Sequence, residues 1–301
     1  MHCIEPGRAA IYPRERRQPL IARIAIVAAL AGTLVPGATA AQRPETVAAF
    51  DAYVSHAEAQ ILQEQNSLKS FLAIPVDSAV GHTEPEGRLG QGELFVERRG
   101  RGSTEVPGGL IHHWRGVTFI PNATVGQVLA VLQDYDHLAR FYRPEMVASH
   151  LISHNGDNLH VSMRLRETKV ITVVLDTEYE VQYGRLDAAH QYSLSRSVRV
   201  TEIANPGERD EHPLAKGDDH GFMWRLNTYW RFVQATDGVF VQCEAISLTR
   251  DVPTGLGWLI GPFIENIPRE SLQFTLSATR AAVLANITTN RQSKTSQTAT
   301  P

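Results

Sequence analysis

Apolar and polar residues alternate with a period of two over much of the second half of the chain. In residues 169–184 the odd positions from Ile171 onward are apolar, aromatic or threonine, whereas Asp176, Glu178 and Glu180 occupy even positions. Such alternation is typical of a strand with one buried face. The same kind of pattern predicts further strands at residues 110–120, 147–155, 158–167, 190–203, 220–235 and 239–251.

Short turn sequences connect several of these strands, and helical periodicity frames them. Asn155-Gly156 and Thr236-Asp237-Gly238 are typical hairpin turns, so the neighbouring strands are expected to be antiparallel. Apolar residues at spacings of three and four predict helices at residues 43–70, at 124–142 with a break near Asp134–Asp136, and from Ile264 onward. The fold class is therefore α+β: a curved antiparallel sheet wrapped around a long C-terminal helix, with an extra N-terminal helix.

The alternation also predicts which side chains face the closing helix. The candidate ligand-binding residues on that inner face are Met163, Tyr179, Tyr192, Arg196, Trp224, Thr228, Trp230 and, on the helix itself, Phe274. Aromatic walls with a few hydroxyl or indole donors suit amphipathic ligands. Plain core packing needs the same inward pattern and stays open as the alternative.

Arg196 is the charged member of this inner set. A buried guanidinium needs partners, because an unpaired charge away from water is costly. Arg196 is therefore either a clamp for the polar head of a ligand or a residue that reaches water through a slipped register or a strand end.

The order strand, helix pair, about six strands and long C-terminal helix resembles the START/Bet v 1-like (SRPBCC, polyketide cyclase-like) helix-grip superfamily. The local match is in the first helix pair and consists of Val125, Val128, Leu129, Val131, Leu132, Asp134-Tyr135, Leu138, Phe141 and Pro144. The resemblance covers residues 110–288. It implies an apolar cavity between helix and sheet that holds a lipid, sterol, polyketide or quinone, and it does not imply catalysis. The N-terminal helix and the insertion at residues 205–219 depart from a minimal member.

The first forty residues predict an export signal. Arg14, Arg16, Arg17 and Arg23 form a basic region, and the apolar run at residues 21–35 is interrupted only by Arg23. Ala38-Thr39-Ala40 has the small-x-small form of a signal peptidase site. An uncleaved anchor is the alternative, although the run is short for a membrane span. The Arg16-Arg17 pair leaves the twin-arginine route open beside the general secretory route. We expect the mature protein to be periplasmic or secreted.

The predicted organisation is a signal peptide at 1–40, an N-terminal helix and linker at 41–109, a helix-grip domain at 110–288 and a disordered tail at 289–301.

Charge is nearly balanced, with 29 basic and 32 acidic residues, which argues against nucleic-acid binding. Cys3 lies in the signal segment, so Cys243 has no partner for an intramolecular disulfide. Zinc spacings, a phosphate loop and a nucleotide fingerprint are missing from the sequence, so we expect no metal, no cofactor and no catalytic residue.

The stretch at residues 255–263 is a glycine-punctuated apolar loop by sequence. Trp258 and Phe263 could sit at a cavity mouth and make transient contact with a membrane surface. The alternative is that these side chains fold inward and plug the end of the sheet, because large exposed apolar patches are uncommon.

The sequence thus predicts an exported protein that binds a hydrophobic or amphipathic small molecule, such as a lipid, a quinone or a polyketide-like compound. One alternative is a polyketide cyclase or dehydratase, which would need an acid or base inside the cavity. The other is a partner-binding module with a closed cavity.

Overall fold

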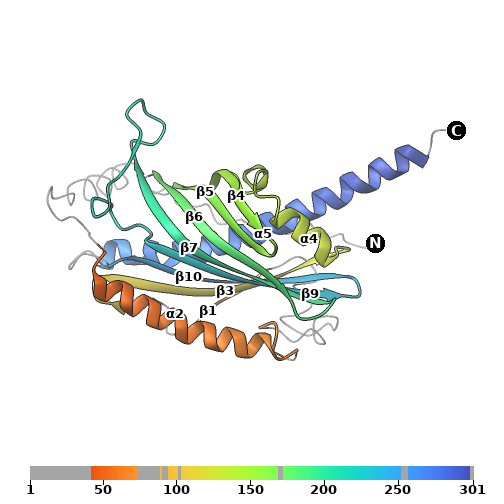
Figure 1. Cartoon of the computed structure of the whole chain (residues 1–301), viewed down its shortest axis with the longest axis horizontal. Coiled ribbons are helices and arrows are strands. Elements are labelled where there is room, and N and C mark those ends of the chain that lie inside the picture. The colour runs from red at the N-terminus through yellow and green to blue at the C-terminus, as the bar shows by residue number, and fades with distance from the viewer. Residues whose placement is uncertain are drawn as a thin grey trace, which may run out of the picture. The chain divides into compact units, whose positions relative to one another are not determined.

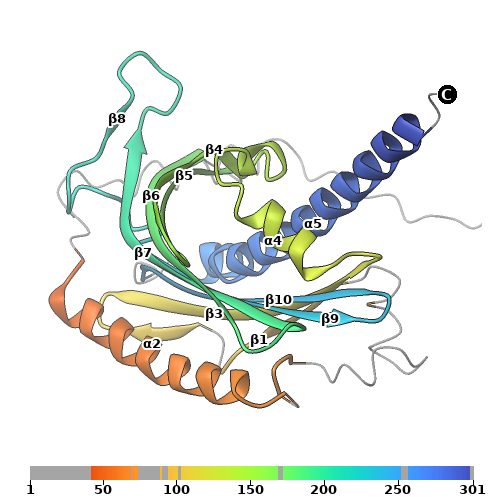
Figure 2. The same cartoon turned by 45° about the vertical axis from the view of Figure 1, so that its right-hand side comes forward.

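A curved antiparallel sheet is the framework of the computed structural model (Figures 1 and 2). Its strand order is β1, β3, β10, β9, β7, β6, β5, β4, while β2 pairs with β3 and β8 pairs with β7. The strands are β1 (Phe95–Arg98), β2 (Thr104–Val106), β3 (Gly109–Pro121), β4 (Met146–Asn155), β5 (Asn158–Thr168), β6 (Thr172–Arg185), β7 (His190–Ala204), β8 (His212–Pro213), β9 (Arg225–Ala235) and β10 (Gly238–Arg250). The predicted α+β class with an antiparallel sheet is confirmed.

The structure describes residues 42–68, 70–73, 89, 94–100, 103–168, 172–251 and 257–298; within the last range, side chains are described for 266–289 and 292. These residues belong to one compact unit, which comprises residues 39–168 and 172–301. The predicted export signal, residues 252–256, and the side chains of Trp258 and Phe263 lie outside what the structure describes.

The helix pair predicted after the first long strand is present and breaks where expected. Helix α4 (Val125–Leu132) begins with a capping box, in which Thr124 and Gln127 bond each other's backbone amides. It ends before Asp134, and the short 3-10 helix η2 (Leu138–Arg140) follows. The buried face of α4 carries Val125, Val128, Val131 and Leu132.

The C-terminal helix α5 (Gly257–Thr298) crosses the concave face of the sheet. It approaches β3 closely, because a Cβ built on Gly116 would lie 2.6 Å from Leu276 Cδ1. Arg280 Nε also donates a 3.1 Å hydrogen bond to the carbonyl of Phe119. The predicted closing helix therefore covers the inner face, and glycine at position 116 makes that contact possible.

Helix α5 is longer than predicted at both ends. Residues 257–263, predicted as a loop, form its first turns, and residues 289–298, predicted as a disordered tail, continue it. No glycine or proline interrupts the chain between Ala285 and Thr298. Thr288 and Thr289 donate to the carbonyls four residues earlier, a bond that threonine makes inside a helix.

The N-terminal helix α2 (Pro44–Gln65) covers the other, convex face of the sheet (Figure 2). Its buried side chains are Phe50, Val54, Ala57 and Ile61, and they pack against Ile111, Trp224, Tyr229, Ile246 and Leu248. The sheet is thus apolar on both faces and lies between two helices. Residues 41–109, predicted as a helix and linker outside the domain, supply this second layer and the edge strands β1 and β2.

Candidate functional site

The concave face is the side of the sheet that faces α5. The register of the strands and the core packing place these residues on it: Leu159, Val161, Met163 and Leu165 of β5; Leu175, Thr177, Tyr179, Val181 and Tyr183 of β6; Ser193, Ser195 and Ser197 of β7; Leu226, Thr228, Trp230 and Phe232 of β9; and Val239, Val241, Cys243 and Ala245 of β10. None of these twenty side chains carries a charge.

Five of the eight predicted site residues come together on this side of the sheet. Met163, Tyr179, Trp230 and Phe274 all pack into the cluster between the concave face and α5. Thr228 shares their face, since it pairs with Ala245 of β10 and with Ser195 of β7.

The other three predicted site residues lie on the convex side, and their predicted inward position is wrong. Tyr192 packs against the cluster around Phe119 and Phe240, whereas Trp224 packs beneath α2 and donates from Nε1 to Asp219 at 2.7 Å. The Arg196 side chain is 49% exposed and donates from Nε to Glu58 Oε1 of α2 at 2.9 Å.

The physical reason for this error is the cover on the convex face. Because α2 and the segment after it bury that side of β7, apolar Tyr192 and Leu194 point outward there. A bulge beside Tyr179 adds one residue to β7, which changes the alternation further along the strand. Apolar alternation therefore marks the convex side of this strand.

The serines of β7 that alternate with those residues are site candidates, although the predicted inward position of Tyr192 and Arg196 implied that the serines faced outward. Ser193 is buried opposite Trp230, and Ser195 and Ser197 pair with Val181 and Tyr179 of β6. The sequence shows a serine at every second position from 193 to 197. This pattern alone also fits a face exposed to solvent, so it indicates a binding face only when both faces of the sheet are known to be covered.

The Tyr179 hydroxyl is buried without a hydrogen-bond partner among the described residues. Tyr179 is 3% exposed, and the neighbouring Thr177 hydroxyl donates instead to the carbonyl of Met163 at 2.9 Å. Burial raises the pKa of Tyr179 to about 12, against a smaller lowering by the neighbouring Thr177 side chain, so the phenol is neutral at physiological pH and can donate. An unmade hydrogen bond of this kind costs about 1–3 kcal/mol.

Nearby buried tyrosines differ in that their hydroxyls are paired. Tyr135 Oη lies 3.0 Å from Tyr183 Oη, and Tyr142 Oη lies 2.6 Å from Thr279 Oγ1 of α5. Burial raises the pKa of Tyr135 to about 12 and raises that of Tyr142 as well. Among the tyrosines of this core that the structure describes, Tyr179 is thus the one whose hydroxyl makes no hydrogen bond of normal geometry.

The concave face stays partly accessible although α5 lies over it. The apolar side chains that pack against the core but keep some exposed surface are Met163, Leu165, Leu226, Trp230 and Phe274. The hydroxyl-bearing Ser195, Ser197 and Thr228 are also only half-buried. An accessible apolar surface with a few polar groups is the usual chemistry of a small-molecule site.

No family model and no curated protein sequence matches this chain. Among solved structures it is similar to the STAR-related lipid transfer protein from Xanthomonas axonopodis, with 19% identity, a TM-score of 0.39, and 64% of this chain and 98% of that one covered. It is also similar to the Zhui aromatase/cyclase from Streptomyces sp. R1128, with 12% identity, a TM-score of 0.41, and 59% and 96% covered. It is also similar to a START superfamily protein from Mycobacterium smegmatis, with 11% identity, a TM-score of 0.39, and 58% of this chain and 98% of that one covered.

The element order and the strand order decide the fold. One helix pair interrupts an otherwise continuous antiparallel sheet, and the long last helix lies in its concave face. The chain has the START/Bet v 1-like helix-grip fold. The resemblance stated from the sequence is confirmed at this level.

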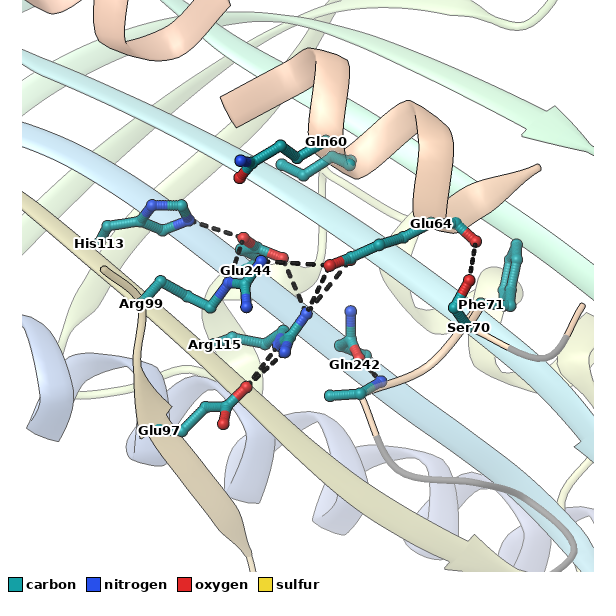
Figure 3. Close-up of polar contacts among 12 residues, drawn as sticks. Gln60, Glu64, Ser70, Phe71, Glu97, Arg99, His113, Arg115, Gln242 and Glu244 are labelled. Carbon is teal, nitrogen blue, oxygen red and sulfur yellow. Dashed lines mark hydrogen bonds and ion pairs between the residues drawn. The ribbon is translucent and has the colours of Figure 1, made fainter. Parts of the chain in front are cut away.

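A second polar site lies on the convex face of the helix-grip sheet, beneath α2 (Figure 3). We call it the ion cluster; it consists of Glu64, Glu97, Arg99, His113, Arg115, Arg231 and Glu244. Glu244 is 1% exposed and lies 2.6 Å from His113 Nε2. Glu64 of α2 reaches Arg99 at 3.1 Å, and both Arg115 and Arg231 at 3.2 Å.

The charges of the ion cluster compensate one another. Burial alone would raise the pKa of Glu244, but the hydrogen bond from His113 and the charges of Arg115 and Arg99 outweigh it, and the pKa is lowered. Tyr53 Oη lies 2.9 Å from His113 Nδ1, which extends a chain of contacts from α2 to Glu244. Burial raises the pKa of Tyr53, so this phenol is neutral at physiological pH. The contacts of the ion cluster with Tyr53 and Glu64 tie α2 to the sheet.

A polar hollow of about 390 Å³ lies at the strand ends of the β4–β5 hairpin, and Asn155, His160, Gln182 and Arg196 line it. It is open and mostly polar, and it is separate from Trp230 and Phe274. In the part of the chain that the structure describes, no three His, Cys, Asp or Glu side chains are placed to hold a metal ion.

Proposed function

We propose that this protein binds a hydrophobic or amphipathic small molecule, such as a lipid, a quinone or a polyketide-like compound, on the concave face beneath α5. The proposal rests on the half-buried apolar side chains of that face, which include Met163, Leu226, Trp230 and Phe274. The free hydroxyl of Tyr179 adds a polar contact beside them.

Burial of apolar surface supplies the driving force. A ligand that covers about 300 Å² of apolar surface gains roughly 7 kcal/mol. Part of this is offset by the lost freedom of the ligand and by ordering of side chains. Before that offset, 7 kcal/mol corresponds to a Kd of about 10 μM, so tight binding requires a larger buried apolar surface or added hydrogen bonds. Binding of this kind suits a carrier or a binding protein and requires no reaction.

Native mass spectrometry tests the proposal. The protein is purified from the cell envelope, its intact mass is measured under native conditions, and any bound compound is extracted with organic solvent. We expect a complex that is heavier than the polypeptide by one small molecule. Uptake of the uncharged dye N-phenyl-1-naphthylamine, which fluoresces in apolar surroundings, provides an independent measurement.

A matched pair of variants places the ligand. Thr228→Trp adds a large side chain next to Trp230 on the concave face, and Gln182→Trp adds the same side chain to the exposed convex side of β6. We expect Thr228→Trp to lose the bound molecule and the dye, and Gln182→Trp to keep both, with the same circular dichroism. A protein that carries nothing and takes up no dye, or two variants that behave alike, would contradict the proposal.

We further propose that the protein acts after export, as the basic and apolar segments before Ala40 suggest. The expected mature polypeptide begins at Ala41 and is recovered from the periplasm or the medium. Intact-mass analysis of the fractionated protein measures this directly. A full-length polypeptide in the cytosolic fraction would overturn export without affecting the ligand proposal.

Transient contact with a membrane surface is the remaining part of the proposal. Trp258 and Phe263 lie in the first turns of α5 and are candidates for this contact. Among the described residues, no helix has the length and apolar character that crossing a bilayer requires. We expect the double variant Trp258→Ser/Phe263→Ser to co-sediment less with phosphatidylethanolamine–phosphatidylglycerol vesicles than the unchanged protein, and equal sedimentation would argue against the contact.

A further inference from the structure

Charge is distributed unequally between the two faces of the sheet. The twenty concave-face residues named above are apolar or hydroxyl-bearing, with Cys243 as the thiol. Beyond the bulge in β7 the buried Glu202, which pairs with Leu175, adds an anion to this face and no cation. On the same strands, the convex positions include Asp176, Glu178, Glu180, Arg196, Arg231 and Glu244. A sheet that binds an anionic head group would be expected to carry at least one cation on the binding side.

The cations that the described residues place on this side stand at its margin: Arg185 at the end of β6, which pairs with Gln191, and Arg98 and Arg280, which are engaged by other groups. Arg98 of β1 lies over the Trp114 ring, 5.0 Å from its centroid. Arg280 of α5 donates to the backbone carbonyl of Phe119. Neither lies beside Tyr179, whose strand is separated from β3 by β7, β9 and β10.

Polar groups do exist at the centre of the concave face, and all of them are neutral. Ser195, Ser197 and Thr228 surround the strand positions of Tyr179 and Val181. The Tyr179 hydroxyl has no partner among the described residues, so it is free to donate to an oxygen atom of a bound molecule. Moving an ionised carboxylate or phosphate into such surroundings without a cation is strongly unfavourable, whereas a carbonyl, ether or hydroxyl oxygen finds a donor.

We propose that the molecule held on the concave face is uncharged where it lies against β6, β7 and β9, and that one of its oxygen atoms accepts a hydrogen bond from Tyr179. This inference rests on the proposed function and restricts the class of ligand that the concave face binds. Ionised fatty acids and phosphate-bearing head groups are excluded from the centre of the site. Alcohols, ketones, quinones and esters with an apolar body are accepted.

Two dyes that differ by one charge test the exclusion of anions. N-phenyl-1-naphthylamine is neutral, and 8-anilino-1-naphthalenesulfonate is the same skeleton with a sulfonate. We expect the neutral dye to bind at least about tenfold more tightly to the full-length mature protein. Displacement of the neutral dye by 1-dodecanol and by dodecanoate at pH 8 repeats the comparison with one chain length.

Adding a cation on the binding face should reverse the preference. Ser195→Lys places an ammonium beside Thr228 and Val181, whereas Gln182→Lys adds the same charge to the convex side. We expect Ser195→Lys to gain affinity for the sulfonated dye relative to the neutral one, and Gln182→Lys to leave the ratio unchanged.

The role of Tyr179 is tested by removing its hydroxyl group and by comparing ligands with and without an oxygen atom. Tyr179→Phe is expected to weaken displacement by 1-dodecanol about three- to tenfold and to leave displacement by 1-dodecene unchanged, because the alkene makes no such hydrogen bond. Tyr192→Phe removes a hydroxyl from the convex side of the neighbouring strand and should change neither.

The outcomes separate this inference from the proposed function. Binding of neither dye overturns the proposed function itself. Equal binding of both dyes by the unchanged protein, which needs no variant to fold, leaves ligand binding in place and overturns the exclusion of anions. Equal loss of the alcohol and the alkene in Tyr179→Phe overturns the assigned hydrogen bond.

Discussion

Arg231 donates a hydrogen bond of 2.8 Å from Nη2 to the backbone carbonyl of Ile61, near the C-terminal end of α2. The donor lies on β9, is 1% exposed, and sends a second bond of 2.8 Å from Nη1 to the carbonyl of Phe71. A carbonyl oxygen has two lone pairs, so it can accept from a side chain as well as from the helix backbone. A guanidinium with five donors in a fixed plane suits this position, and it ties α2 and the segment after it to the convex face.

We expect Arg231→Met to lower the free energy of unfolding by about 3 kcal/mol, because breaking a buried network leaves its other members unpaired. Two buried carbonyls lose their donor, and Glu64 loses one of its cations. Urea unfolding followed by circular dichroism measures the change. Limited proteolysis should then cut within α2 before it cuts the sheet.

Arg199→Met is the matched control. Arg199 forms an ion pair with Glu178, and its side chain is 57% exposed. Such surface pairs contribute little, so we expect a change within about 0.5 kcal/mol. If both variants unfold at the same urea concentration, the buried guanidinium does not anchor α2.

Most of the fold could be predicted from the sequence because its strands alternate cleanly and follow one another through short turns. Asn155-Gly156 and Asp237-Gly238 fix two hairpins, and hairpins leave few ways to order the strands. Each neighbouring pair from β4 to β7, and β9 with β10, is adjacent in sequence as well as in space. The helix at α2 was predicted too, but its position on the convex face was not, because an amphipathic pattern does not say which surface a helix covers.

The candidate site could be predicted only where one face of a strand is clearly more polar than the other. In β5 and β6 the charged positions lie outward, so Met163 and Tyr179 were placed correctly on the concave side. In β7 the outward side is covered by α2, and the apolar residues follow that cover. Arg231 and Glu244 are buried although they are charged, because their partners come from segments far away in the sequence.

Arg196→Ala tests the corrected position of Arg196. We expect no change in dye or ligand affinity, because the side chain lies across the sheet from Tyr179 and binds Glu58 of α2. Its loss should cost no more than about 1 kcal/mol, since the pair is half-exposed to solvent. A dye titration and urea unfolding of the same preparation measure both, and a large loss of ligand affinity would restore the clamp suggested by the sequence.

The contact between Gly116 and Leu276 limits how closely α5 can lie on the sheet. A Cβ at position 116 would be 2.6 Å from Leu276 Cδ1, and Leu276 is fully buried. We expect Gly116→Ala to destabilise by about 1–3 kcal/mol through overpacking. Leu276→Ala alone should cost about 2–5 kcal/mol, and the double variant should cost less than the sum because the new methyl fills part of the space.

Gly126→Ala is the control for the backbone effect of replacing glycine. Gly126 lies in α4, and a Cβ at this position would have Thr124 Oγ1 as its nearest atom, at 3.9 Å. Alanine is the better helix former by about 1 kcal/mol, so this variant should be slightly more stable than the unchanged protein. Strict additivity of the Gly116 and Leu276 variants in a double-mutant cycle would show that the two side chains do not limit each other.

His112 predicts a loss of stability on mild acidification. It is 1% exposed, and its ring nitrogens lie 3.0 Å from the hydroxyls of Ser103 and Thr249. Burial, aided by the nearby charge of Arg98, lowers its pKa from 6.5 to about 4. Between these two values the unfolded chain binds a proton that the folded chain does not, so stability falls as the pH drops from 6.5 toward 4.

A depression of this size corresponds to a loss of up to about 3 kcal/mol over that range. Urea unfolding at pH 7.5, 5.5 and 4.5 measures it, and His112→Gln is the comparison because glutamine offers a donor and an acceptor without titrating there. The carboxylate of Glu244, whose pKa is lowered, contributes its own acid sensitivity below the ordinary carboxyl range. The difference between the two proteins from pH 6.5 to 4.5 therefore reports on His112. We expect the glutamine variant to lose less stability over that interval than the unchanged protein; parallel curves would mean that His112 takes up its proton in the folded state as readily as in the unfolded chain.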